Sequence, residues 1–198
     1  MMAINLGDKP LAGFGEPIEM LQDCHRRIEH FLNVLRKVES QFGERELTDD
    51  GRRALTAALD YFVNSAPRHT ADEEHSLFPR VRRSENSDAR AVMAELDRLE
   101  HDHRRCEMRH ALVDQLGRRW LDRGRLEEDQ RTCLRAALDE LASVYAGHIQ
   151  MEEQRVFPIA SQILKADQIR EVGEEMRARR SLTRTGNAIE GSSERKSF

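Results

Sequence analysis

Apolar residues recur at alternating three- and four-residue steps in four separate segments of the chain. This spacing places them on one face of an α-helix, so the pattern predicts four amphipathic helices. The four apolar stripes run from Ile18 to Leu35, from Leu55 to Glu73, from Val92 to Val113 and from Leu134 to Ile159. Each stripe also contains a histidine, a residue type that needs a partner when it is buried.

Proline, glycine and capping residues indicate where these helices begin, bend and end. Pro17 suits the first turn of the first helix, and Gly43 lies just past its end. Thr48, followed by two acidic residues, is a typical N-cap for the second helix. Pro67 predicts a kink in that helix and Pro158 a bend in the fourth, because proline cannot donate the helical hydrogen bond.

The predicted fold is all-α, an up-down-up-down four-helix bundle over residues 16–165 with short connections. Residues 1–15 contain three glycines and a proline without periodicity, and we expect an extended N-terminal arm. A weaker helical pattern over 166–181 predicts a short C-terminal helix that packs on the outside. Residues 182–198 are polar and aperiodic, and we expect them to be disordered.

Composition narrows the classes of function. Apolar residues make up 38% and charged residues 34% of the 198 residues, which suits helices with wide solvated faces. The net charge of −4 argues against general binding to nucleic acid or to an anionic membrane. Three cysteines without CxxC spacing favour a reducing compartment. No run approaches about 18 apolar residues, so we expect a soluble, cytoplasmic protein.

Two stretches of the chain repeat each other. The segment HTADEEHSLFP beginning at His69 aligns with HIQMEEQRVFP beginning at His148, with His, Glu, Glu, Phe and Pro at the same offsets. The preceding helices align as well, through DCHRRIE around His25 and HDHRRCE around His103. His103 follows His25 by 78 residues and His148 follows His69 by 79. The predicted bundle is therefore a tandem repeat of a helical hairpin.

Helix lengths place the four repeated histidines at one level of the bundle, at 1.5 Å rise per residue. Glu73 and Glu152 follow His69 and His148 by four residues, on the same helix faces. Four imidazoles and two carboxylates on buried stripes would be costly without partners. A pair of divalent first-row transition metals would supply those partners, with the two carboxylates between them.

These motifs resemble the hemerythrin-like, or HHE cation-binding, family over about residues 17–165. Members have a four-helix bundle with one histidine in each odd helix and HxxxE in each even helix, commonly followed by Phe-Pro or Leu-Pro. The resemblance implies a non-haem centre of two iron ions. The ligands carried over by position are His25, His69, Glu73, His103, His148 and Glu152.

The resemblance implies a protein that engages O₂ or a related small oxidant, such as NO or peroxide, for sensing, buffering or detoxification. The alternatives are an iron storage or delivery protein, an iron–sulfur cluster repair protein, and a di-iron oxidase or peroxidase. Oxygen-carrying members have a second histidine four residues after the first in the third helix, where this chain has Glu107. The set of four histidines and two glutamates is closer to bacterial proteins that repair iron–sulfur clusters, whose cysteine-bearing N-terminal domain has no counterpart here.

Other polar residues near the stripes have competing interpretations. We prefer His103 over His101 as the ligand, because His103 lies on the stripe. His110 lies on the same stripe two turns further on, and we expect it to pack in the core or to support a ligand residue from outside the metal site. The off-stripe histidines His30 and His75 are expected at the surface.

The neighbouring acidic and thiol groups are assigned by the same logic. Glu29 and Glu107 flank the stripes, which favours ion pairs with arginine over contact with a ligand histidine. Glu74 and Glu153 either support the ligands from outside or are solvated. Cys24, Cys106 and Tyr145 adjoin the ligand turns, and packing is the favoured role for these three residues.

Overall fold

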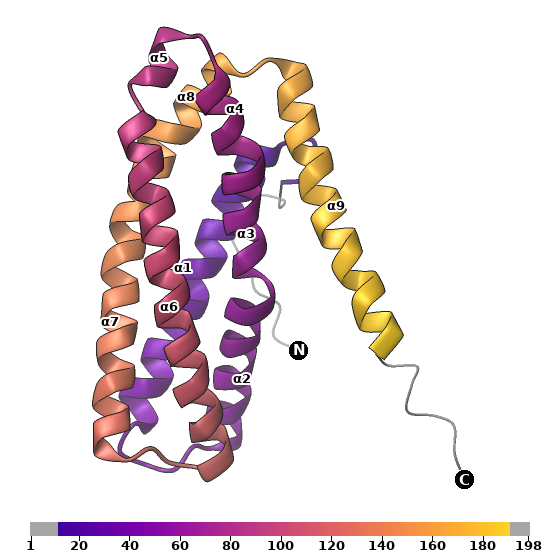
Figure 1. The fold of residues 1–198 in the computed structure, drawn as a ribbon. Helices are drawn as coiled ribbons and strands as arrows, with labels where there is room; N and C mark the ends of the chain where they lie inside the picture. Colours follow the sequence, from indigo (N-terminus) through magenta and orange to yellow (C-terminus); the bar gives the residue numbers. More distant parts are fainter. Residues whose placement is uncertain (1–11, 191–198) are drawn as a thin grey trace.

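The computed structural model describes residues 12–190, with side chains through Ser181, and every regular element in this part of the chain is helical (Figure 1). The prediction of an all-helical fold is confirmed. The helices form four long rods and two additional segments. In chain order they are α1 (Pro17–Phe42), α2 (Asp49–Asn64), α3 (Ala66–Asp72), η1 (Glu73–Leu77), α4 (Phe78–Arg83), α5 (Ser87–Arg90), α6 (Met93–Arg123), α7 (Glu128–Met151), η2 (Glu152–Val156), α8 (Phe157–Ile163) and α9 (Ala166–Glu190).

The four rods lie side by side (Figure 1). The first is α1, the second runs from α2 through α4, the third is α6, and the fourth runs from α7 through α8. Helix α1 packs against α2 and α7, and α6 packs against the same two helices. This arrangement gives each rod two neighbours and one face that points to the interior.

Capping residues, proline and glycine lie at the helix ends. Thr48 accepts a hydrogen bond from the Gly51 N–H through its side-chain oxygen, which caps α2. Pro17 occupies the first turn of α1, and that helix ends at Phe42, immediately before Gly43. Gly124 ends α6 with a φ of 76°, a left-handed conformation that glycine adopts without a steric penalty.

The second and fourth rods contain a widened π-helical turn at the HxxxEE motif. In η1 the Phe78 N–H donates to the Glu73 carbonyl five residues back, and in η2 the Phe157 N–H donates to the Glu152 carbonyl. The next residue in each rod is proline, which has no N–H and clashes with the carbonyl four residues back in a regular helix. Widening the turn relieves this conflict. The bend predicted at Pro158 therefore takes the form of a π turn.

The kink predicted in the second rod lies at Ser65, two residues before Pro67. Helix α2 ends at Asn64, the Ser65 N–H donates to the Tyr61 carbonyl, and α3 begins at Ala66. Proline is well tolerated in the first turn of α3, because its missing N–H would have no helical partner there. The rod continues past the kink in nearly the same direction (Figure 1).

Two apolar clusters fill the interior, one on each side of the level that holds the repeated histidines. One cluster includes Leu21 and Leu99, and the other includes Ile28 and Cys106. On α1 and α6 these residues lie one turn before and one turn after the histidine. The buried histidines and glutamates therefore form a polar layer between two apolar cores.

Helix α9 packs across the outside of α1, α3 and η1 (Figure 1). It buries Val172 and Met176 against the cluster around Leu21. Its backbone continues to Glu190, nine residues beyond the predicted end at 181. The disordered tail over 182–198 stays a prediction, and residues 191–198 of it, like most of the arm predicted at 1–15, lie outside the described residues.

None of the helices in the described part of the chain is long and apolar enough to cross a membrane.

Candidate metal centre

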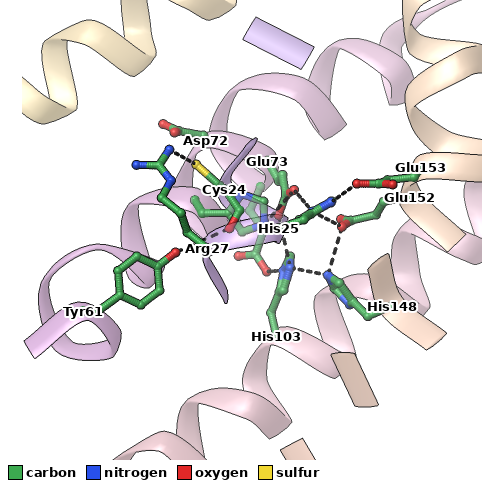
Figure 2. A network of polar contacts seen from close by, with 12 residues as sticks. Cys24, His25, Arg27, Tyr61, Asp72, Glu73, His103, His148, Glu152 and Glu153 are labelled. Carbon is green, nitrogen blue, oxygen red and sulfur yellow. Dashed lines mark hydrogen bonds and ion pairs between the residues drawn. The ribbon is translucent and has the colours of Figure 1, made fainter. Parts of the chain in front are cut away.

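The four repeated histidines and the two glutamates come together in the polar layer of the bundle. Figure 2 shows His25, His103 and His148 gathered around Glu73 and Glu152. They form two groups of four, and the ligand atoms of each group lie within 4.8 Å of one another. The first group consists of His25, His69, Glu73 and Glu152. The second consists of Glu73, His103, His148 and Glu152. Both glutamates belong to both groups, which is the arrangement expected for two metal ions bridged by carboxylates.

In the first group, α1 and α3 supply the imidazoles. The Nε2 atom of His25 lies 3.0 Å from a carboxylate oxygen of Glu152 and 3.9 Å from one of Glu73. The Nε2 atom of His69 lies 3.3 Å from the same Glu73 oxygen. The two rings are nearly perpendicular, with centroids 4.8 Å apart. Each ring therefore presents the same nitrogen to the space between the carboxylates.

In the second group, α6 and α7 supply the imidazoles. The Nε2 atom of His103 lies 3.3 Å from the other oxygen of Glu73, and the Nε2 atom of His148 lies 3.3 Å from an oxygen of Glu152. The two nitrogens are 3.1 Å apart. All four histidines thus turn Nε2 inward, and Glu73 directs one oxygen toward each group.

Several polar atoms of these six side chains have no hydrogen-bond partner in the protein. All six side chains are buried, and the carboxylates of Glu73 and Glu152 have no exposed surface. All four of their oxygens are without a hydrogen-bond partner, as is the inward Nε2 atom of His25. Leaving one buried polar group without a partner destabilises the fold by about 1–3 kcal/mol, and a charged group costs more. Imidazole nitrogens and carboxylate oxygens are ligands for iron, zinc and manganese, so these residues fit a metal pair.

A second set of carboxylates holds the outward nitrogens of the histidines. Glu153 lies 2.9 Å from Nδ1 of His25, and Glu74 lies 2.8 Å from Nδ1 of His103. Such contacts fix the ring orientation and raise the basicity of the inward nitrogen. Of the two roles considered for these glutamates, the structure shows the supporting one.

Asp102 lies near the second group, and the repeat did not point to it. Its carboxylate lies 4.0 Å from Nδ1 of His148, which is beyond hydrogen-bond distance, and that nitrogen has no hydrogen-bond partner. Asp102 precedes His103 on α6, and its equivalent in the first half of the repeat is Cys24.

Burial and ion pairing move the histidine pKa values in opposite directions. Burial lowers the pKa of His69 to about 4, so that its imidazole is neutral at pH 7. Burial also opposes the charged form of His103, but the nearby carboxylates of Glu73 and Glu74, at 3.3 and 2.8 Å from its ring nitrogens, outweigh it and raise its pKa to about 10. Carboxylates also raise the pKa of His25 despite its burial, so without a metal, protons on His25 and His103 balance the carboxylates. Metal binding must displace these protons, so affinity rises with pH.

The remaining histidines divide as the stripes predict. His30, His75 and His101 are exposed and outside both groups. His110 is partly buried, and its Nε2 atom lies 2.8 Å from the hydroxyl of Tyr145. Neither of these two residues belongs to the ligand groups.

Glu29 and Glu107 are exposed and contribute to neither group. Cys24 and Cys106 are buried beside the site, and neither forms a disulfide. Burial raises the pKa of both thiols, that of Cys106 to about 12. Both therefore remain protonated at neutral pH and are weak nucleophiles.

Comparison with known proteins agrees with this geometry. The model of the hemerythrin HHE cation binding domain matches residues 16–160, which contain all six residues of the two groups. A protein of Haemophilus influenzae, described only as an uncharacterized protein, is 28% identical over 178 residues. The match covers 89% of this chain and 97% of that protein. The domain match spans most of the chain, which belongs to the hemerythrin HHE cation-binding domain family.

Proposed function

We propose that the chain is a di-iron protein that engages O₂ or a related small oxidant such as NO or peroxide. The proposed role is sensing, buffering or detoxification in the cytoplasm, where its cysteines would stay reduced. The proposed ligands of the two ions are His25, His69, Glu73, His103, His148 and Glu152.

One observation supports this proposal above the others, the sharing of Glu73 and Glu152 between two four-residue groups. A single metal ion would use only one group and would leave the two histidines of the other group buried without a metal ion to bind. Two ions use every donor, including the four carboxylate oxygens that lack a protein partner. The geometry therefore favours a dinuclear centre over a mononuclear one.

The protein ligands leave room for a small molecule. Each group supplies two imidazoles and two carboxylates, whereas iron accepts about six ligands in related carboxylate-rich sites. A bound iron pair would supply electrons and a Lewis-acidic site for a diatomic or peroxide ligand. The protein residues hold the pair in a buried layer, and Glu74 and Glu153 keep the imidazoles of His103 and His25 in position.

Two matched substitutions test the ligand assignment. His69→Ala removes a buried imidazole that faces Glu73, and His75→Ala removes an exposed histidine from the same rod. We expect the first variant to lose at least one iron ion per chain and the second to keep the full content. Helical content should be unchanged in both, because the apolar stripes survive. Equal loss of iron from both variants would refute the assignment.

We also propose that the bundle over residues 16–165 is a tandem repeat of one helical hairpin in up-down-up-down order. Two features of the molecule support this. Each half provides one histidine from a long helix, and each provides HxxxE from a rod that widens into a π turn before proline. The roles of His25 and His69 in the first half correspond to those of His103 and His148 in the second.

A further inference from the structure

A cavity of about 430 Å³ lies between the second rod and α6, on one side of the candidate metal centre. Its walls are mainly apolar and include Leu59, Phe62, Ala66 and Val113. One region is polar, and His103 and Glu74 line the cavity there. This size and lining are typical of small-molecule sites, which combine apolar walls with a few polar groups.

The repeat explains why the cavity opens on this side. Ala66 aligns with Tyr145, and Cys106 aligns with Ile28, at the offsets that superimpose the two halves. At these two positions a small side chain lines the cavity where the other half has a large one. Tyr145 itself turns toward the cavity and contacts His110, which aligns with Leu32. The two halves share their proposed ligands but differ in the space beside them.

The cavity offers a flat wall to an aromatic ring. The rings of Phe62 and His110 stack with centroids 4.3 Å apart and planes 22° from parallel, and both residues line the cavity. The Tyr145 hydroxyl forms a hydrogen bond with His110, so each of these two polar groups already has one partner. Planar rings pack on such a surface in offset or edge-to-face geometries.

Charge around the cavity selects against anions. Three carboxylates line it, from Glu74, Glu107 and Asp114, against the guanidinium of Arg104 and the imidazole of His103, so the acidic groups are in excess. One oxygen of Glu74 contacts His103, and a carboxylate has capacity to accept further hydrogen bonds. The lining thus complements a neutral ligand that donates a hydrogen bond.

We propose that this cavity binds a compact, uncharged aromatic molecule with one hydrogen-bond donor, a phenol-type compound, whose donor faces Glu74. The ring lies among the apolar walls, and the donor lies at the polar region nearest the metal centre. This site goes beyond the proposed function, because it assigns a second, organic ligand to the molecule. It does not require bound iron, so its failure would leave the proposed metal centre untouched.

Binding of 4-fluorophenol to the full chain, followed by fluorine NMR, tests the proposal. We expect saturable binding at millimolar concentration or below. 4-Fluorobenzoate has a similar ring but carries a negative charge, and we expect it to bind at least tenfold more weakly. Absence of saturable binding, or equal binding of the two probes, would overturn the proposal. Iron content is measured on the same preparation, so that the two proposals are judged separately.

Two substitutions that fill part of the cavity test whether the ligand binds there. Ala66→Leu adds volume to one wall, and Cys106→Ile introduces the residue found at the equivalent position of the other half. Each should weaken 4-fluorophenol binding at least tenfold. Ala146→Leu changes an exposed alanine outside the lining and should leave affinity unchanged. Thermal melts identify a variant that fails to fold, in which case the other decides. Unchanged affinity in the folded filling variants would show that binding occurs elsewhere.

Discussion

Helix α9 is fastened to the bundle by a buried ion cluster next to the candidate metal centre. The carboxylate of Asp72, which has no exposed surface, lies 2.5 Å from Arg179 and 2.7 Å from Arg180. Asp72 immediately precedes Glu73, the proposed bridging ligand. We predict that replacing both arginines by methionine destabilises the fold, because the substitution keeps the aliphatic packing and leaves a buried charge without a partner.

The size of the effect follows from burial. Removing the partner of a buried charge costs about 3–5 kcal/mol. Arg179 and Arg180 are 22% and 20% exposed, so solvent already weakens their pairing with Asp72 and the lower end applies, about 3 kcal/mol. With a urea dependence of about 2 kcal/mol per molar, the unfolding midpoint should fall by about 1.5 M. Adding Asp72→Asn removes the charge and should recover most of the loss.

Urea unfolding followed by circular dichroism measures these changes, with a chelator present so that metal binding does not contribute. Arg170→Met, which changes an exposed arginine of the same helix, is the control and should have little effect. If Arg179→Met/Arg180→Met lowers the midpoint no more than the control, the clamp does not stabilise the fold. If the triple variant is as unstable as the double variant, the buried charge is not the cause.

Three further predictions test other parts of the molecule. Burial lowers the pKa of His110 from 6.5 to about 4, so the unfolded chain binds more protons between these values, and stability should fall as pH drops from 6.5 to 4. The contribution is about 3 kcal/mol, and His110→Phe should flatten the pH profile of urea unfolding. Truncation after Ser181 keeps the Asp72 clamp and should leave iron content and the melting temperature unchanged, and a large drop would show that later residues are docked. Glu107→His should not change the optical spectrum of reduced protein mixed with O₂, because position 107 is exposed and outside both groups, and a longer-lived oxygenated spectrum would contradict this.

The helical periodicity and the repeated motif predicted much of the fold and the convergence of the candidate ligands. Every long stripe became a buried helix face, since an amphipathic helix has only one way to remove its apolar residues from water. Stripe position predicted that His103 faces the interior and His101 the surface, and the structure places them so, because residues two apart on a helix point in different directions. Because the histidines lie at matching depth in the two halves of the repeat, the sequence also predicted that they converge.

Features that depend on contacts between distant segments were not predictable. The π turns arise locally, from proline in the same rod, but the sequence predicted a bend at Pro158 without its form. The position of Asp102, 4.0 Å from His148, depends on the relative rotation of α6 and α7. Helix α9 was predicted to pack on the outside, but its weak pattern did not indicate which contacts hold it there, namely those of Val172, Met176 and the arginines facing Asp72. Tertiary contacts of this kind override weak local preference.

Metal analysis of the intact chain, expressed with iron and purified under anaerobic conditions, tests the proposed dinuclear centre most directly. Two groups that share Glu73 and Glu152 predict about two iron ions per chain, with an optical spectrum that changes between reduced and air-exposed protein. Zinc taken up in place of iron during purification in air would not count against the centre, because zinc outcompetes ferrous iron for such ligands. A preparation that contains no metal, or one tightly held zinc ion in every case, would contradict it.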